Sequence, residues 1–455
     1  MAMGKRNRED QGSFWIATSE LPRTAAHPFY EQANQILDSR QFDSFVEGLC
    51  RKFYADKLGR PSLAPAVYFR LLLIGYFEGI DSERGIAWRV ADSLGLRRFL
   101  GYSLTDATPD HSTISRNRRL IDVETHQEVF SWVLGVLAES GLLKGKTVGI
   151  DATTLEANAA MRSIVRKDTD EGYGEFLKRL AQESGIETPT REELAKLDKT
   201  RENKASNDDW ENPHDPDAKI TRMKDGRTHL AHKAEHAVDM DTGAILAVTL
   251  QPADRGDTSS IERTLEAAGE TIVDVVASGS GGQISEEALS EVVADKGYHS
   301  NEVLKRRHHP GVRTYIAEPD RGRRNWEGKT AERDAVYANR RRIRGRHARR
   351  LMRKRGELIE RSFAHCYDTG GMRRTHLRKH ENILKRLLIH VAGFNLSLIL
   401  RGLLGKGTAR GLQGLAARLL GLWDGFRAAI RPRIGPAALL DDQSPQYRRY
   451  QLRAA

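Results

Sequence analysis

The chain has 455 residues, of which 39% are hydrophobic and 30% are charged, so it is long enough for two to four globular domains. Its formal net charge of +11 and pI of about 9.5 indicate a polyanionic partner, because basic side chains release the counterions condensed on phosphates. Two cysteines are too few for a disulfide framework, and the first residues lack an apolar signal region, which argues against a secreted protein.

Helical periodicity dominates residues 43–140, which follow a polar and weakly patterned arm at residues 1–42. The stretch LAPAVYFRLLLIGYFEGI has a proline near its start and a glycine at its end, the usual punctuation of a helix. TPDHSTISRNRRLI then offers Asp110 or Ser112 as the N-cap of a basic helix. Several short helices that end in such a helix are typical of a helix-turn-helix DNA reader, although a helical bundle with a solvated basic face would give the same pattern.

From residue 147 the hydrophobic period changes to that of strands. TVGID is predicted to be a strand, and HKAEHAVD and AILAVTLQP form a predicted hairpin around the turn DTG. TSSIERTLEAAGETIVDVVA is a predicted helix, and EVVAD and VRTYIAEP are two further predicted strands. This order predicts an α/β fold at residues 145–404, with a central sheet covered on both faces.

Three other segments differ from this pattern. Residues 162–218 have sparse apolar positions and mixed charges, so we expect an inserted, helical and partly disordered excursion between the first strand and the hairpin. The apolar run at 383–404 contains Lys385, Arg386 and His390, and is predicted to be a buried helix rather than a membrane span. A basic tail is expected at 405–455.

Two of the predicted strands end in an aspartate, Asp151 in TVGIDATT and Asp295 in VVADKG. An acidic side chain at the carboxyl end of a central strand points into the crevice where α/β sheets bind ligands. Many strands end at an Asp that only starts a turn, but two such acids in a basic protein favour a site. Carboxylate oxygens are the ligands that Mg²⁺ prefers, and this ion keeps positions open for water and phosphate.

A third acid could come from RGELIERSFAHCYDTGGMRR, where Glu357 and Glu360 begin an amphipathic helix. Just before it, 15 of the 35 residues from Arg321 to Arg355 are Lys or Arg. A lone Glu on a helix is usually a solvated surface residue. An acid within an apolar stretch beside a phosphate-binding surface is a candidate metal ligand.

Four blocks, in order over residues 45–404, resemble a bacterial insertion-sequence transposase of the DDE class. They are GRPSLAPAVYFRLLLIGYFEGIDSERGIAWRV with PDHSTISRNRRL, then VGIDATTLEANAA, then VVADKGYHS, then IERSFAHCYDTGGMRRTHLRKHENILKRLLIHVAGFNLSLILR. The resemblance implies an all-helical N-terminal DNA-binding domain and a ribonuclease H-like catalytic domain with a mixed sheet. It also implies that Asp151, Asp295 and Glu360 bind two Mg²⁺ ions, for which Mn²⁺ may substitute.

The third block departs from the family pattern, which often places a Tyr, an Arg and a Lys at set offsets around the Glu. Here Gly356 takes the Arg offset, Arg355 stands one residue away, and no Lys follows within that turn. Either Glu357 or Glu360 could therefore be the third acid, and we favour Glu360 because it begins the IERSFAH block.

The resemblance further implies an enzyme that binds the terminal inverted repeats of its element and catalyses strand cleavage and strand transfer. Its partners would be those repeats and target DNA. It would assemble as a homodimer or a larger synaptic complex, and it would act in the bacterial cytoplasm at the nucleoid. A DNA-binding descendant that has lost cutting, and a metal-dependent nuclease of the same fold, are the alternatives.

Basic side chains in these blocks and in the basic segment are the candidate DNA contacts. They are Arg116, Arg118, Arg119, Lys296, Arg340, Arg341, Arg342, Arg361, Arg373 and Arg374. Tyr298 and His299 either orient DNA or pack in the core. Lys233 or His236, from the predicted hairpin, could lie near the metal ions.

Overall fold

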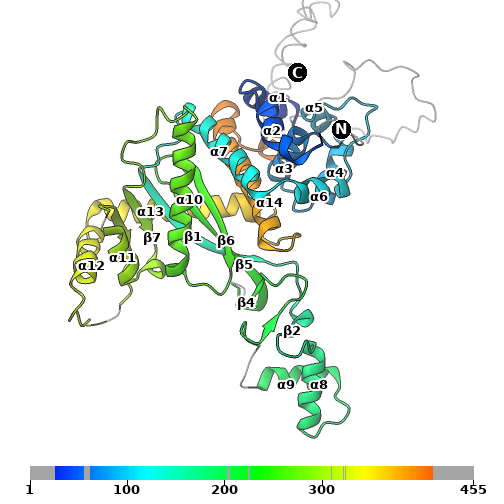
Figure 1. The fold of residues 1–455 in the computed structure, drawn as a ribbon, viewed down its shortest axis with the longest axis vertical. Helices are drawn as coiled ribbons and strands as arrows, with labels where there is room; N and C mark the ends of the chain where they lie inside the picture. The colour runs from blue at the N-terminus through cyan, green and yellow to red at the C-terminus, as the bar shows by residue number, and fades with distance from the viewer. Residues whose placement is uncertain are drawn as a thin grey trace, which may run out of the picture.

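The structure is a computed structural model. It describes residues 26–55, 62–201, 205–223, 226–308, 310–320, 322 and 324–412. Helices at the N-terminal side are followed by a mixed sheet with helices on its faces (Figure 1). The predicted α/β class with a preceding all-helical region is confirmed.

Seven α-helices lie in the described residues of the helical region. They are α1 (Ala26–Asp38), α2 (Phe42–Cys50), α3 (Pro65–Glu78), α4 (Glu83–Ala91), α5 (Leu94–Phe99), α6 (His111–Leu120) and α7 (Val123–Glu139). α3 ends at Gly79, whose φ of 67° is the left-handed cap conformation that glycine adopts at no steric cost. The N-cap of α6 is Asp110 rather than Ser112, because the Asp110 side chain accepts a hydrogen bond from the Ser112 amide.

The expected arm at residues 1–42 includes α1, which belongs to the core. Phe29 and Tyr30 of α1 are buried, and their rings pack edge-on against each other and against Phe77 of α3. This helix is hard to predict from the sequence, because polar residues fill most of its other positions. Residues 1–25 of the expected arm lie outside the described residues.

The central sheet contains six strands. They are β1 (Thr147–Glu156), β4 (Lys219–Arg222), β5 (Thr228–Asp239), β6 (Ile245–Pro252), β7 (Glu291–Ala294) and β8 (Arg313–Ile316). β5 pairs antiparallel with β1, β4 and β6, whereas β7 lies between β1 and β8 and is parallel to both. Along the path β6-β5-β1-β7-β8, β5 runs antiparallel to both β6 and β1, whereas β7 and β8 run parallel to β1. This arrangement is ribonuclease H-like.

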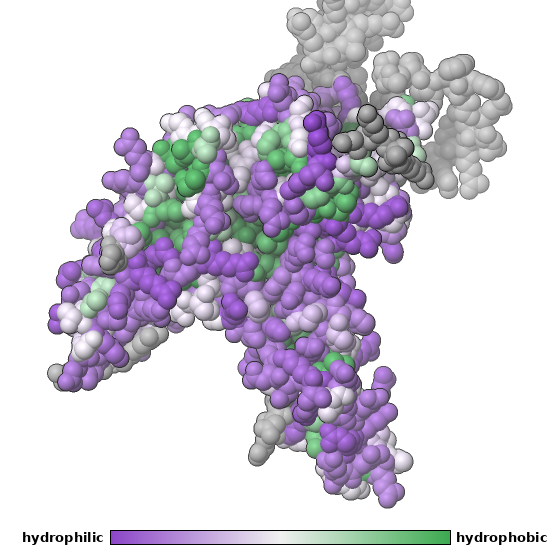
Figure 2. Space-filling view, in the orientation of Figure 1, coloured by the Kyte–Doolittle hydropathy of each residue, from purple (hydrophilic) through white to green (hydrophobic). Residues whose placement is uncertain are grey.

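Helices cover both faces of this sheet. α10 (Asp257–Ala277) lies in front of it in Figure 1, and α13 (Arg346–Phe363) crosses behind it. α13 continues into a π-helical turn, Ala364–Asp368, while α11 (Asn301–His308) and α12 (Thr330–Ile343) flank β8. In Figure 2 the part of the surface formed by α11 and α12 is largely hydrophilic, whereas apolar side chains gather over the middle of the molecule.

The apolar run at 383–404 forms α14 (His380–Leu404), which packs against α3, α7 and β6. By length and composition alone, the helical stretch His380–Leu412 could cross a membrane, but 72% of its most apolar window is buried inside the protein. α14 therefore joins the helical region and the sheet in one hydrophobic core. Of the expected tail at 405–455, residues 413–455 lie outside the described residues.

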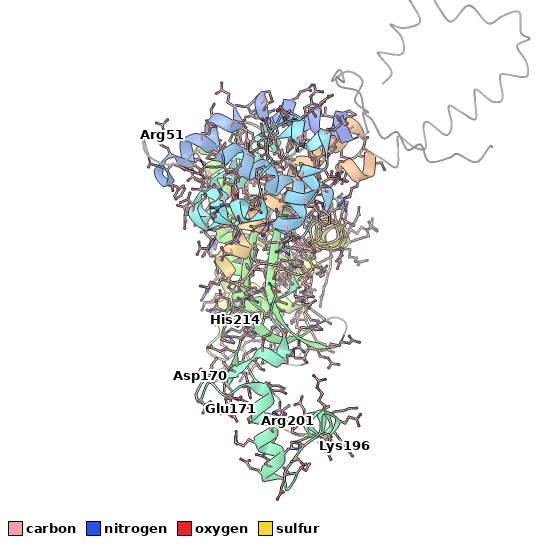
Figure 3. The ribbon with its side chains drawn as sticks, turned by 90° about the vertical axis from the view of Figure 1, so that its right-hand side faces the viewer. Arg51, Asp170, Glu171, Lys196, Arg201 and His214 are labelled. Atoms are coloured by element: carbon pink, nitrogen blue, oxygen red, sulfur yellow. The ribbon has the colours of Figure 1, made fainter. Side chains whose placement is uncertain are left out.

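The insertion at 162–218 projects away from the sheet (Figures 1 and 3). It contains β2 (Val165–Arg166), α8 (Tyr173–Glu183), α9 (Arg191–Thr200) and β3 (Trp210–Glu211). Trp210 and Ile164 are the centre of a small apolar cluster separate from the main core. The expectation that this insertion is helical agrees with α8 and α9, and α8 packs on that cluster through Tyr173 and Phe176. Residues 202–204 lie outside the described residues.

Candidate active site

The two aspartates lie on neighbouring strands: Asp151 is in the middle of β1, which runs on to Glu156 rather than ending at this residue as the sequence predicted, and Asp295 directly follows β7. β1 and β7 are parallel, and their register pairs Gly149 with Val293. If this register is continued by two residues along both strands, Asp151 lies beside Asp295. Side chains at paired positions project to the same face of a sheet, and the two carboxylates are near enough for the charge of Asp295 to raise the pKa of Asp151.

Asp295 is held by the turn that follows β7. Its backbone is extended, and its Oδ1 accepts a hydrogen bond from the Gly297 amide at 2.8 Å, which starts the short 3₁₀ turn Lys296–Tyr298. Among the described residues its Oδ2 accepts no hydrogen bond. Strand β7 thus delivers a carboxylate with one fixed oxygen and one available oxygen.

Arg355 of α13 contacts the first aspartate. Its Nη2 lies 2.6 Å from Asp151 Oδ2, and its Nε donates to the Ile150 carbonyl at 3.2 Å. Although the ion pair is close, Nη2 has no partner with hydrogen-bond geometry among the described residues. α13 can approach β1 this closely because residue 149 is glycine: a Cβ there would lie 3.3 Å from Ile359 Cδ1 and 2.5 Å from Met240 Cε.

Burial raises the pKa of Asp151 to about 6, from an ordinary value of 3.8. The charge of Arg355 and the Ala152 amide lower this pKa, while the charges of Asp295 and Asp257 raise it. Negative charge is therefore concentrated in a poorly hydrated place, with one arginine as the counter-charge.

This shift predicts a pH-dependent stability of the metal-free protein. The folded-state pKa of Asp151 is raised, so the stability that its protonated form contributes is complete below about pH 4 and is lost as the pH rises through 6. Asp151→Asn cannot ionise, and we expect it to melt at a higher temperature than wild type at pH 8 in EDTA, with the difference disappearing by pH 4. The exposed Asp254→Asn is the control; a difference that stays the same at both pH values would contradict the expectation.

The two candidate third acids differ in what they face. Glu360 lines a groove of about 430 Å³ together with Thr153 and Thr154 of β1 and Arg373. Glu357 is exposed and lines no part of this groove. On an α-helix, residue 360 lies about 60° from residue 357 around the axis, and this rotation turns Glu360 toward Thr153 and Thr154, two and three residues past Asp151 on β1.

Three basic candidates lie around this groove and the second aspartate. Lys296 is exposed in the turn after Asp295. Arg373 donates to Thr153 Oγ1 at 2.9 Å and to Asp368 Oδ1 at 2.8 Å, and Arg374 extends into solvent 3.7 Å from Glu156. These side chains put positive charge beside the acids.

Of the three α6 arginines, Arg116 and Arg119 are exposed. Arg118 is only 7% exposed; it forms an ion pair with Glu83 at 2.7 Å and hydrogen bonds to Asn382 Oδ1 at 2.5 Å. We therefore correct the expectation for Arg118, since its side chain ties α6 to α4 and α14 and does not reach the surface.

The remaining arginines lie further away. On α12, Arg341 is exposed, Arg340 is paired with Glu318, and Arg342 donates to the Thr314 carbonyl. Arg361 lies against the turn between β5 and β6, where a Cβ on Gly243 would be 3.4 Å from its Nη2. That turn is at the amino end of β1, so Arg361 points away from the two aspartates.

The candidates on the strands and beside Asp295 mostly pack. Tyr298 and His299 are buried. His236 lies opposite Asp151 in the β1–β5 register, but its ring nitrogens bond to Ser362 Oγ and Tyr367 OH, and burial lowers its pKa to about 3. His236 is therefore a neutral core residue rather than a ligand.

Two residues near the acids were not singled out as site residues from the sequence. Arg355 was noticed only as an offset from the family pattern. Asp257, the first residue of α10, is close enough to raise the pKa of Asp151, and nothing in a helix-starting DTSS stretch distinguishes it from an ordinary N-terminal acid.

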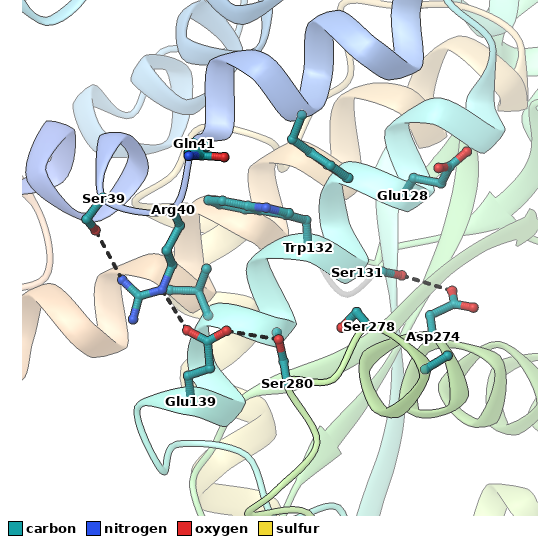
Figure 4. Close-up of a pocket in the computed structure, with 14 residues that line it drawn as sticks. Ser39, Arg40, Gln41, Glu128, Ser131, Trp132, Glu139, Asp274, Ser278 and Ser280 are labelled. Atoms are coloured by element: carbon teal, nitrogen blue, oxygen red, sulfur yellow. Dashed lines mark hydrogen bonds and ion pairs between the residues drawn. The ribbon is translucent and has the colours of Figure 1, made fainter.

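A larger hollow, of about 750 Å³, lies elsewhere, between α2, α7 and the end of α10 (Figure 4). Two pairs of its polar groups bind one another, Arg40 with Glu139 and Ser131 with Asp274. Neither Asp151 nor Asp295 lines this hollow. We therefore place the candidate active site at these two carboxylates and not in the hollow.

The donor set formed by Asp151 and Asp295 fits a hard divalent cation. Asp151 and Asp295 offer adjacent carboxylates whose mutual repulsion a cation would relieve, and carboxylate oxygens suit Mg²⁺. Within the described parts of the chain, no three His, Cys, Asp or Glu side chains lie close enough together to hold a metal ion. Glu360 therefore has to approach the pair before all three acids can share one.

A ribonuclease H-like sheet with one acid on its central strand and a second just after the neighbouring strand is typical of the polynucleotidyl transferase and nuclease class. The family model described as Transposase domain (DUF772) matches residues 19–120, and the model described as Transposase DDE domain matches residues 195–396. The chain belongs to the DDE transposases of insertion sequences. The second match includes Asp295 and Glu360 but begins after Asp151. No curated protein and no solved structure matches the chain.

Proposed function

We propose that this transposase binds the terminal inverted repeats of its own element and catalyses divalent-metal-dependent strand cleavage and strand transfer. The observation that carries the proposal is the register that places Asp151 beside Asp295. These two acids, with Glu360 from α13, would hold two Mg²⁺ ions, and Mn²⁺ would substitute for them. When bound, such ions activate a water or a DNA 3′-hydroxyl and stabilise the leaving oxygen.

The chain's own side chains would supply binding and orientation. Arg116 and Arg119 on α6, and Lys296 and Arg374, would contact DNA phosphates, which fix the register of a protein on DNA; their exposure supports this role. Two element ends have to be held together, so we propose a homodimer or larger complex acting in the cytoplasm at the nucleoid. The net charge of +11 supports a nucleic-acid partner.

The test is cleavage of a labelled duplex that carries the DNA flanking the coding region, with Mg²⁺ and with EDTA, and binding measured in parallel. We expect Mg²⁺-dependent cuts at the element boundary and tighter binding to the repeat than to scrambled DNA. Cutting without preference for the repeat would indicate a nuclease instead. Binding without any cutting by the folded protein would indicate a DNA-binding descendant.

The choice between the two glutamates has its own test. Glu360→Gln should reduce the cleavage rate by about a hundredfold or more. Losing a residue that only orients a metal ligand lowers activity by about 10–100-fold, and losing the ligand itself should lower it at least as much. Glu357→Gln is the matched control, being exposed on the same helix, and should cut at the wild-type rate. The same duplex assay measures both, and the reverse pattern would make Glu357 the third acid.

A further inference from the structure

A buried polar network lies on the α10 face of the sheet, behind the two aspartates. Lys233 of β5 is 5% exposed, and its Nζ donates to Asp257 Oδ1 at 2.5 Å and to the Arg255 carbonyl at 3.1 Å. Glu235, two residues along the same strand, is fully buried. Burying charged groups is costly unless each is paired, so the whole network has to be held in one arrangement.

Glu235 connects the network to the turn after β7. It accepts hydrogen bonds from Tyr298 OH at 2.7 Å, from Ser260 Oγ at 2.7 Å and from Thr264 Oγ1. Tyr298 is the last residue of the turn that begins at Asp295. The end of that turn is therefore anchored to β5 and α10 through one hydroxyl.

Asp257 abuts the middle of the same turn. A Cβ on Gly297 would lie 2.4 Å from Asp257 Oδ2 and 3.1 Å from Asp295 Oδ1, so only glycine leaves room for both carboxylates. The charge of Asp257 also acts on Asp151. Asp257 is thus a fourth acid at the site, fixed by Lys233 on one oxygen and packed against the Asp295 turn with the other.

We infer that Asp257, Lys233 and Glu235 are positioning residues for Asp295: they clamp its turn through Gly297 and Tyr298 and so set its carboxylate beside Asp151. This inference rests on the proposed function of Asp295 and adds to it. The clamp acts from the α10 face, on the opposite side of the sheet from Arg355 and α13. Each aspartate is therefore oriented from a different face.

The first readout is amide hydrogen exchange of the full-length, metal-free protein. In Asp257→Asn and in Tyr298→Phe, we expect peptides containing residues 295–299 to exchange at least several-fold faster than in wild type, with exchange in β1 and α14 unchanged. Asp254→Asn is the control, because Asp254 is exposed in the loop between β6 and α10, just before Asp257. Unchanged exchange at 295–299 in both variants would overturn the inference.

The second readout is affinity for Mn²⁺ alone, measured by calorimetry. We expect Asp257→Asn and Gly297→Ala to weaken it by about 10–100-fold, the usual cost of losing a residue that orients a ligand, with binding to repeat DNA unchanged. A lower melting temperature without this loss would indicate a structural role and overturn the inference.

The two proposals fail in different ways. If wild type binds no Mn²⁺ and never cuts, the proposed function fails, and the exchange experiment still decides whether the network holds the turn. If wild type binds Mn²⁺ and cuts, but Asp257→Asn does both equally well, only the positioning role fails.

Discussion

Asp295→Asn should abolish strand cleavage and leave DNA binding intact. Asparagine has the same shape, and its amide oxygen can still accept the hydrogen bond from the Gly297 amide, so the turn after β7 is preserved. What is lost is the charge of a carboxylate that would hold a divalent ion. Losing an outer-shell partner of a metal site typically costs about 10–100-fold, so losing a ligand should cost about a hundredfold or more in cleavage rate.

The chain contains a matched control for this change. Asp320 follows β8, and its Oδ1 accepts a hydrogen bond from the Gly322 amide in the same Asp-x-Gly arrangement, but it is exposed and lies beyond the site. Asp320→Asn should therefore cut the labelled duplex at the wild-type rate. Equal losses in the two variants, or full activity of Asp295→Asn, would remove Asp295 from the catalytic site.

The sheet could be predicted from the sequence because its strands carry a strong local signal. Val148 and Ile150 before Asp151, and Val292 and Val293 before Asp295, mark buried strand segments that are followed by a charge. That the two strands are parallel neighbours is a non-local fact, and the resemblance supplied it rather than the pattern.

The surroundings of the acids could not be predicted in the same way. Asp257 opens a helix, as many acids do, and its place beside Gly297 depends on how α10 packs on β5. Arg118 is a basic residue on a basic helix, as a DNA contact would be. It lies on the buried side of α6, however, and forms an ion pair with Glu83. α1 was missed because only a few of its side chains face the core.

A second large effect is expected where α14 joins the helical region to the sheet. Arg386 is 2% exposed, and its guanidinium donates to the Leu72 carbonyl at 2.9 Å and to the Ile80 carbonyl at 3.0 Å, at the end of α3. It lies over Gly75, where a Cβ would be 1.8 Å from Nη2. Burial lowers the pKa of Arg386 to about 10, so the side chain is still charged at neutral pH.

Arg386→Met keeps most of the volume but leaves those two carbonyls without their charged donor. Because hydrogen bonds to charged groups contribute about 1.5–3 kcal/mol each, we expect the free energy of unfolding to fall by about 3 kcal/mol after the gain from no longer burying a charge. Thermal unfolding and limited proteolysis would measure this loss. Gly75→Ala should destabilise in the same way by displacing the guanidinium, whereas Arg401→Met, at a half-buried position of the same helix, should not. If Arg386→Met melts like wild type, the guanidinium does not hold α14 against α3, and apolar packing alone joins the helical region to the sheet.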